Sequence, residues 1–151
     1  MQQGLIWLKR RQKTRPTDIA RELNVSRAFV SKALRMAEVR IENLLKHVAS
    51  VNHVKLRHLS GKYGIAVGYC PTHRKDTYIV YSPAIGVHSW FPHAGNCDDC
   101  SERPNCEKEL RQLAIEWKVP IGEGMPPTEL GEHLFDTVMR RLGWKNNPEP
   151  D

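Results

Sequence analysis

Residues 16–34 of the chain read PTDIARELNVSRAFVSKAL, and this stretch decides the architecture of the N-terminal half. The spacing of its apolar residues predicts two short helices that cross at a steep angle. Asn24 tolerates the left-handed backbone that a tight turn needs, and Ser26 is a good N-cap for the second helix. The apolar positions are Ile19, Ala20, Leu23, Val25, Val30 and Leu34. The stretch is therefore predicted to form a helix-turn-helix.

The exposed side of the second predicted helix carries hydrogen-bond donors and small side chains. Such residues suit DNA phosphates and the edges of bases in the major groove. The expected DNA contacts are Arg15, Thr17, Ser26, Arg27, Ala28, Ser31, Lys32 and Arg35. Because amphipathic helix pairs that bind only protein have a similar spacing, a protein-binding helix pair is the alternative interpretation.

The positive charge of the chain is concentrated in residues 1–60. These carry 13 Lys or Arg and 4 Asp or Glu, a net charge of +9, whereas residues 61–151 carry 10 and 13, a net charge of −3. Together they give the overall charge of +6. A basic run precedes the motif and is well placed to contact backbone phosphates. It consists of Lys9, Arg10, Arg11, Lys13 and Arg15. This distribution indicates a DNA-binding head joined to a separate body.

Two further helical features surround the motif. Residues 2–12 predict a first helix with Leu5 and Leu8 on its inner face and Ile6 or Trp7 at its edge. No Gly or Pro interrupts residues 26–60, so we expect a long third helix. Its apolar residues recur at spacings of four and three, the pattern of a coiled coil. This seam consists of Val30, Leu34, Ala37, Ile41, Leu44, Val48 and Val51. We predict a homodimer through this helix; the alternative is packing against the C-terminal body of the same chain.

The motif resembles a known class of DNA-binding head. Residues 25–32, VSRAFVSK, followed by RIEN at residues 40–43, are similar to archaeal Tfx-type regulators and to the related sigma-factor region that reads promoter DNA. The resemblance covers about residues 14–45. It implies a transcription regulator whose recognition helix enters the major groove.

Residues 62–95 change in character toward β-branched and aromatic side chains. Three such stretches, residues 63–69, 77–81 and 87–91, predict about three antiparallel strands separated by turns. A sheet of this size buries little apolar surface alone, so it needs a partner helix or a metal to stabilise it.

Four cysteines are the candidate metal ligands. Cys97, Cys100 and Cys106 have the spacing C-x2-C-x5-C, and Cys70 ends the first predicted strand. A reducing cytoplasm keeps thiols free, which favours a metal site over disulfides. Four thiolates can close around a 4Fe–4S cluster or a tetrahedral zinc ion. His73 is an alternative zinc ligand, because Cys70 and His73 have the spacing C-x2-H.

The cysteine spacing resembles the iron–sulfur signature of WhiB-like regulators, and a similar spacing occurs in the cluster of RecB-type nuclease domains. Residues 100–107, CSERPNCE, are similar to the WhiB pattern, in which a helix follows the last cysteine. The resemblance implies a 4Fe–4S cluster on the four cysteines, with zinc as the alternative.

Two helices are expected after the cysteines, over residues 107–117 and 128–142. The second has one apolar face, and Gly143 is placed to end it. This face consists of Leu130, Leu134, Val138 and Leu142. The polar residues 146–151 are expected to form a disordered tail.

These expectations combine into an α+β chain: a three-helix helix-turn-helix with an extended third helix, then a small antiparallel sheet with the cysteine site, then C-terminal helices. The predicted parts are a DNA-binding and dimerising head at residues 1–60, a metal-binding sensor body at 61–145, and a tail at 146–151.

The expected function is that of a cytoplasmic, dimeric transcription regulator that binds double-stranded DNA and senses redox or iron state through its cluster. RNA polymerase is a further candidate partner. No signal peptide or membrane-length apolar run is apparent, so no membrane partner is expected. An enzyme is not expected, because no Ser/His/Asp set, phosphate loop or acidic metal cluster is visible. The alternative is a zinc-stabilised regulator or a structural adaptor to the transcription machinery.

Overall fold

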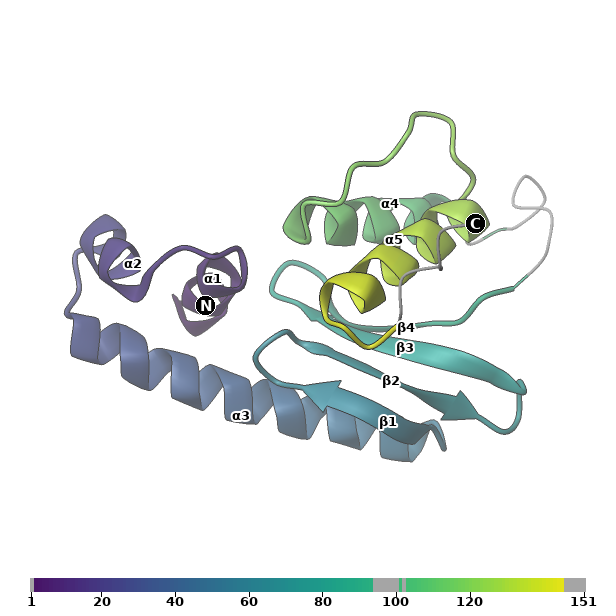
Figure 1. The fold of residues 1–151 in the computed structure, drawn as a ribbon, viewed down its shortest axis with the longest axis horizontal. Helices are drawn as coiled ribbons and strands as arrows, with labels where there is room; N and C mark the ends of the chain where they lie inside the picture. Colours follow the sequence, from purple (N-terminus) through teal and green to yellow (C-terminus); the bar gives the residue numbers. More distant parts are fainter. Residues whose placement is uncertain (1, 94–100, 102, 146–151) are drawn as a thin grey trace. The chain divides into compact units, whose positions relative to one another are not determined.

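The structure is a computed structural model that describes residues 2–93, 101 and 103–145. Within these residues the chain is α+β, as predicted, with five helices and a four-stranded antiparallel sheet (Figure 1). It divides into two compact units, Met1–Ser89 and Trp90–Asp151. The elements are α1 (Gln2–Arg11), α2 (Pro16–Leu23), α3 (Arg27–Val51), β1 (Lys55–Ser60), β2 (Ile65–Cys70), β3 (Lys75–Ser82), β4 (Gly86–Trp90), α4 (Arg103–Glu116) and α5 (Pro127–Arg141).

The first unit begins with three helices that share a small apolar core. Its buried residues are Ile6, Ile19, Ala20, Val30 and Ala33, with Leu23, Val25 and Leu34 packed against them. Removing such side chains from water stabilises the fold by about 25 cal/mol per Å² of apolar surface. This head core therefore holds α1 and α2 against the N-terminal half of α3.

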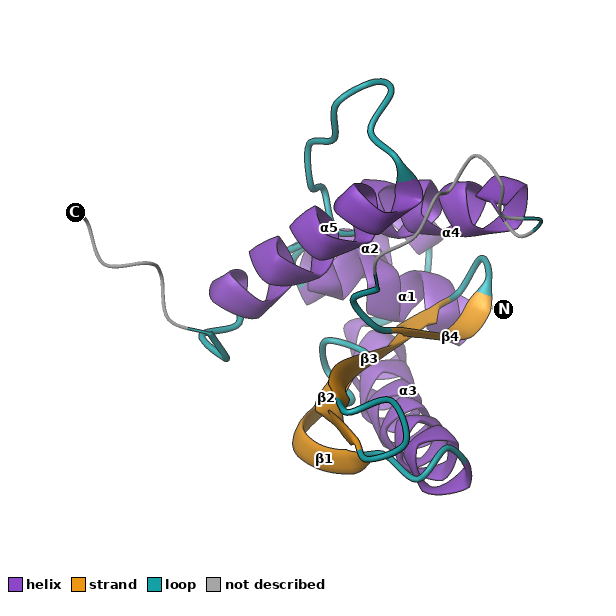
Figure 2. Ribbon diagram, turned by 90° about the vertical axis from the view of Figure 1, so that its right-hand side faces the viewer, coloured by secondary structure: helices purple, strands orange, loops and turns teal. Residues whose placement is uncertain are grey.

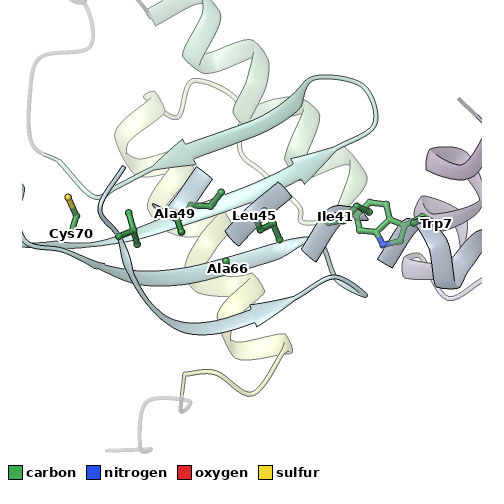
Figure 3. Close-up of a cluster of buried hydrophobic side chains, with 9 residues drawn as sticks. Trp7, Ile41, Leu45, Ala49, Ala66 and Cys70 are labelled. Carbon is green, nitrogen blue, oxygen red and sulfur yellow. The ribbon is translucent and has the colours of Figure 1, made fainter. Parts of the chain in front are cut away.

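A second core lies where α3 meets one face of the sheet. Figure 3 shows Trp7, Ile41, Leu45 and Cys70 among its side chains. In Figure 2, as in Figure 1, α3 runs beside the strands. The buried members of this sheet core are Trp7, Ala37, Ile41, Leu45, Ala49, Val54, Ala66, Cys70 and Ile79. Helix α3 thus belongs to both cores, its first half to the head and its second half to the sheet.

Helix α1 turns a different face inward from the one predicted. Ile6 and Trp7 are buried, whereas Leu5 is 44% exposed. The indole N–H of Trp7 donates to the carbonyl of Gly61 at 3.0 Å. A Cβ on Gly61 would lie 2.2 Å from the carbonyl oxygen of Glu38, so only glycine lets this turn approach α3 so closely. The turn after β1 therefore fixes the position of Trp7, and through Trp7 it fixes α1 against the rest of the first unit.

The predicted coiled-coil seam is only partly buried within the chain. Leu44 and Val51 are 39% and 61% exposed, whereas Leu45 and Ala49 are buried. The buried residues are Val30, Ala33, Ala37, Ile41, Leu45 and Ala49, mostly four apart. Each step of four residues rotates the buried face by about 40°, since the helix turns about 100° per residue. The rotation follows the change of partner from α1 and α2 to the sheet, so Val30, Ala37 and Ile41 of the predicted seam pack within the chain while Leu44 and Val51 do not.

The third helix also ends earlier than expected, at Val51. Asn52 is its C-cap, and the Asn52 side-chain amide donates to the carbonyl of Val48 at 2.9 Å. His53 has a φ of 56°, which allows the chain to leave the helix direction. The following residues form β1, a strand that the sequence analysis missed because Leu56 and Leu59 also fit a helical pattern.

The strands form a meander in the order β1-β2-β3-β4, and β2 pairs antiparallel with β1 and β3. The register of β1 shifts between Leu56 and His58, at Arg57. The Arg57 guanidinium donates two hydrogen bonds, of 2.8 and 2.9 Å, to the carboxylate of Asp76 on β3, and these raise the pKa of Arg57. Because the sheet packs on α3, the division predicted at residue 60 falls inside the first unit.

The second unit contains α4 and α5, whose bounds lie within a few residues of those predicted. Leu130, Leu134 and Val138 of α5 are buried, which confirms the predicted face. Trp90 stacks on Phe135 with ring centroids 5.3 Å apart, as expected of a core residue. None of the helices in the described ranges has the length and apolar character needed to cross a membrane. The predicted tail, 146–151, lies outside the described residues.

The turn residue Asn24 offers a test of the local fold, because it is exposed and has φ 55° and ψ 47°. We expect Asn24→Gly to change the free energy of unfolding by less than about 0.5 kcal/mol. Asn24→Val should lower it by about 1–2 kcal/mol, since a side chain with a branched Cβ is strained in the left-handed region. Chemical denaturation followed by circular dichroism measures both variants. Equal effects would show that the turn does not depend on this backbone conformation.

Candidate nucleic-acid interface

The turn between α2 and α3 holds the first residues of α3 at the surface. The N–H of Val25 donates to the carbonyl of Ala20 at 3.0 Å, and Val25 packs partly buried against the head core. The hydroxyl of Ser26 accepts a hydrogen bond of 3.0 Å from the N–H of Phe29, which confirms Ser26 as the N-cap. The direction in which α3 leaves the turn is therefore fixed by local contacts.

The eight predicted contact residues lie on α2 and α3 or just before these helices. Seven are exposed and Ser31 is half-buried. The exposed ones are Arg15, Thr17, Ser26, Arg27, Ala28, Lys32 and Arg35. The hydroxyl oxygen of Ser26 accepts the capping bond, so this residue positions the helix, and the capping bond does not use its O–H. Arg15 forms a hydrogen bond of 2.9 Å with Asp18, and this bond raises the pKa of Arg15.

The electrostatics differ between the two helices. Residues 24–37 contain Arg27, Lys32 and Arg35 but no Asp or Glu. Both acidic residues of α2 form ion pairs: Asp18 with Arg15, and Glu22 with Lys9 at 2.7 Å. Residues 1–40 carry 10 Lys or Arg and 3 Asp or Glu, a net charge of +7. The first turns of α3 therefore carry positive charge and no carboxylate, as α1 does, whereas α2 carries two carboxylates.

Sequence reasoning missed Phe29, which is 43% exposed on the first turn of α3. It is rotated by about 100° from its neighbour Val30, which is buried in the head core. Its position off the apolar stripe of the helix is the feature of the sequence that could have identified Phe29 as exposed. A large exposed aromatic side chain between Ala28 and Lys32 adds an apolar contact to an otherwise polar face.

The predicted metal ligands are only partly described. Cys97 and Cys100 lie outside the described residues, and Cys106 is half-buried on α4. Cys70 is 5% exposed and belongs to the sheet core (Figure 3), an environment in which a thiol packs as a small apolar group. His73 is exposed in the turn between β2 and β3. Among the described residues, no three His, Cys, Asp or Glu are grouped as metal ligands.

The two candidate sites thus differ in what the described part of the chain provides. On the first turns of α3, exposed cationic side chains are held by a well-defined turn. At the cysteines, half of the predicted ligand set lies outside the described residues. Among known proteins, no family model, no curated protein and no solved structure matches this chain.

Proposed function

We propose that the chain is a DNA-binding transcription regulator in which α2 and α3 act as a helix-turn-helix. One observation carries this proposal: the first turns of α3 are exposed, basic and free of carboxylates. Duplex DNA carries one negative charge per about 1.7 Å of its axis, so a face of this kind is attracted to it. The major groove, about 12 Å wide, admits one α-helix.

The spacing along α3 assigns the groove-facing side chains. Ala28, Ser31, Lys32 and Arg35 follow the pattern i, i+3, i+4, i+7 and therefore share one face of the helix. In this proposal, Lys32 and Arg35 donate to base edges, with guanine O6 and N7 as their preferred acceptors. Ala28 lets the helix approach closely and, with Phe29 beside it, offers apolar contact to thymine methyl groups.

The residues around this face are assigned to the DNA backbone. Arg15 and Thr17 at the start of α2, and Arg27 at the start of α3, are exposed and would contact phosphates. Such contacts position a protein on DNA without reading its sequence. Specificity in this proposal therefore rests on α3 alone.

The proposal is tested by titrating a labelled random duplex and following fluorescence anisotropy at several salt concentrations. We expect binding whose logarithmic affinity falls linearly with the logarithm of salt, with a slope of about −0.9 per phosphate contacted. Selection from a random-sequence pool should then enrich a defined site. Absence of binding at about 50 mM salt, or enrichment of no sequence, would contradict the proposal.

A protein-binding adaptor is the second candidate function, and the charge of the second unit favours it. Residues 90–151 carry 7 Lys or Arg and 12 Asp or Glu, a net charge of −5, which suits a basic protein surface. RNA polymerase is the candidate partner in this reading. Crosslinking in cells that recovers polymerase subunits but no defined DNA sites would favour the adaptor over the regulator.

We also propose a metal site on the cysteines, a 4Fe–4S cluster or, as the alternative, zinc. A cluster would be held by Cys70, Cys97, Cys100 and Cys106, and zinc either by the same four cysteines or by Cys70, His73, Cys97 and Cys100. The burial of Cys70 among apolar side chains supports a packing role, whereas His73 is exposed. A bound cluster would supply redox chemistry, and its loss would change DNA affinity. Equal DNA affinity of the metal-loaded and metal-free protein would contradict sensing.

Cysteine variants test the metal site. We expect Cys106→Ser to remove a metal held by the four cysteines, because that site loses a quarter of its ligands, whereas zinc held through His73 should be kept. For an iron–sulfur cluster, Cys70→Ser should also remove it while His73→Ala does not. For zinc bound through C-x2-H, His73→Ala should remove it. Elemental analysis and visible absorption of anaerobically purified protein measure the outcome. A wild-type protein free of both metals would contradict the site.

A homodimer stays part of the proposal, on an exposed face of α3 that shares Leu44 and Val51 with the predicted seam. Met36, Val39, Leu44 and Val51 are between 36% and 61% exposed. They fall within less than half of the helix circumference, at about 100° per residue. Since α3 also carries the proposed DNA contacts, pairing two copies of this face would set the spacing of two heads on DNA.

Val39→Glu tests this pairing, because it places a charge on the exposed apolar face. We expect the wild-type chain to sediment as a dimer and Val39→Glu to shift it toward the monomer by at least about tenfold in dissociation constant. Thr72→Glu, at an exposed position in the turn between β2 and β3, is the control and should stay dimeric. A wild-type protein that is monomeric at all concentrations would rule out the dimer.

A further inference from the structure

The first unit contains a cationic pocket with a volume of about 170 Å³. It lies where α1, the loop after α1, α3 and the turn between β1 and β2 meet. Four of its lining residues are cations, Arg10, Arg11, Lys13 and Lys62, and one is a carboxylate, Glu38. Residues more than 50 positions apart in sequence thus bring an excess of three positive charges to one concavity.

Three of these four cations make no ion pair inside the described part of the chain. There, Arg10, Lys13 and Lys62 make no ion pair, although the same helices form close pairs elsewhere, such as Lys9 with Glu22. Glu38 likewise makes no ion pair with any described residue. Like charges gathered on one cavity wall repel each other, and a bound anion relieves that repulsion.

The pocket is held in shape by its own contacts. The Arg11 guanidinium donates to the carbonyl of Tyr63 at 3.2 Å and lies 4.8 Å from the centre of the Trp7 ring. The ammonium of Lys62 lies 5.4 Å from the centre of the Tyr63 ring. Side chains ordered before binding lose little freedom when a ligand arrives, which favours affinity.

Size and wall chemistry limit the ligand. The volume corresponds to about five or six water molecules at roughly 30 Å³ each. Trp7, Leu34 and Tyr63 add apolar wall to the cationic one. Arginine recognises phosphate through paired hydrogen bonds, and a phosphate monoester carries nearly two negative charges at pH 7. Such a group matches the excess of three positive charges better than a single carboxylate does.

We propose that this pocket binds a small phosphate monoester, with the phosphate between Arg10, Arg11 and Lys62 and a short organic group against Tyr63. The proposal does not depend on DNA binding. The ligand bridges α1 and the β1–β2 turn, and so links the head core to the sheet core. Binding therefore also raises the thermal stability of the first unit.

The test titrates the full chain, free of DNA, with inorganic phosphate and with methyl phosphate at constant ionic strength, by calorimetry. We expect saturable binding of one ligand per chain. The double variant Arg10→Ala and Lys62→Ala should weaken it about ten- to a hundredfold, since two charge-assisted hydrogen bonds are lost. The double variant Lys46→Ala and Lys55→Ala removes the same charge at exposed positions outside the pocket and should change affinity less than twofold.

Glu38→Gln provides a variant with the opposite expected sign. Removing the one carboxylate of the pocket should tighten phosphate binding about two- to fivefold. Lys62→Ala alone, on an exposed turn, keeps the test valid if the double pocket variant does not fold. Binding that does not saturate, equal weakening in the control, or no gain from Glu38→Gln would overturn the proposal. A second result would also overturn the proposal: the wild-type chain binds neither phosphate probe, and the pocket variants lower its affinity for DNA. The pocket would then belong to the DNA interface.

Discussion

Replacing Lys32 and Arg35 together by glutamate is expected to abolish measurable DNA binding. Both side chains are exposed on one face of α3, in a segment without carboxylates. A good base contact contributes about 1–3 kcal/mol, so losing two should weaken binding from about 30-fold to more than a thousandfold. The two new carboxylates add repulsion from the phosphates. Anisotropy titration with the selected duplex measures the loss.

The matched control is the double variant Lys55→Glu and Lys75→Glu. It changes the net charge equally and lies at exposed positions of β1 and β3, outside α3. Only long-range attraction should fall in the control, and screening limits this effect because the Debye length is about 10 Å at 0.1 M salt. Circular dichroism should report unchanged helix content for both proteins. If the control loses as much affinity, the binding follows overall charge and the assignment of α3 as the reading helix is wrong.

Features set by neighbouring residues could be predicted from the sequence. The left-handed conformation of Asn24 and the capping bond of Ser26 both depend on residues within a few positions. The buried face of α5 was predictable for the same reason, because one partner surface serves its whole length and Leu130, Leu134 and Val138 keep a helical period.

Features set by distant partners could not be predicted. Along α3, the large side chains of Leu44 and Val51 suggested an inward face, yet the smaller Ala49 is buried beside the sheet. A helix that exchanges one partner for another rotates its buried face, and no periodicity in its own sequence records the partner. Strand β1 was missed on similar grounds, since its pairing with β2 depends on residues after the following turn.

The candidate sites show the same contrast between features set by neighbouring residues and features set by distant partners. The exposed cations of α3 were predictable, because they lie off the apolar stripe of one helix. The cationic pocket was not, because Arg10 and Lys62 belong to elements separated by the whole of α2 and α3. The basic run before the motif was expected to contact DNA, whereas three of its members, Arg10, Arg11 and Lys13, line the pocket.

Trp7→Ala is expected to be the most destabilising single substitution in the first unit. Trp7 is 1% exposed, donates to Gly61, and meets the Tyr81 ring edge-on at 5.3 Å between centroids. Truncating a buried aromatic side chain costs about 3–5 kcal/mol, because a cavity replaces its contacts. The buried carbonyl of Gly61 also loses its donor. Urea denaturation followed by circular dichroism measures the change in free energy of unfolding.

Two variants of the same helix sharpen this prediction. Trp7→Phe keeps an aromatic ring but removes the indole donor, so it should cost less than the alanine variant. Leu5→Ala removes an exposed side chain and should cost less than about 1 kcal/mol. Leu5 is also the residue that the sequence pattern placed inward. If Leu5→Ala proved as costly as Trp7→Ala, α1 would bury the face predicted from sequence. The contact of Trp7 with the β1–β2 turn would then not be what joins the helices to the sheet.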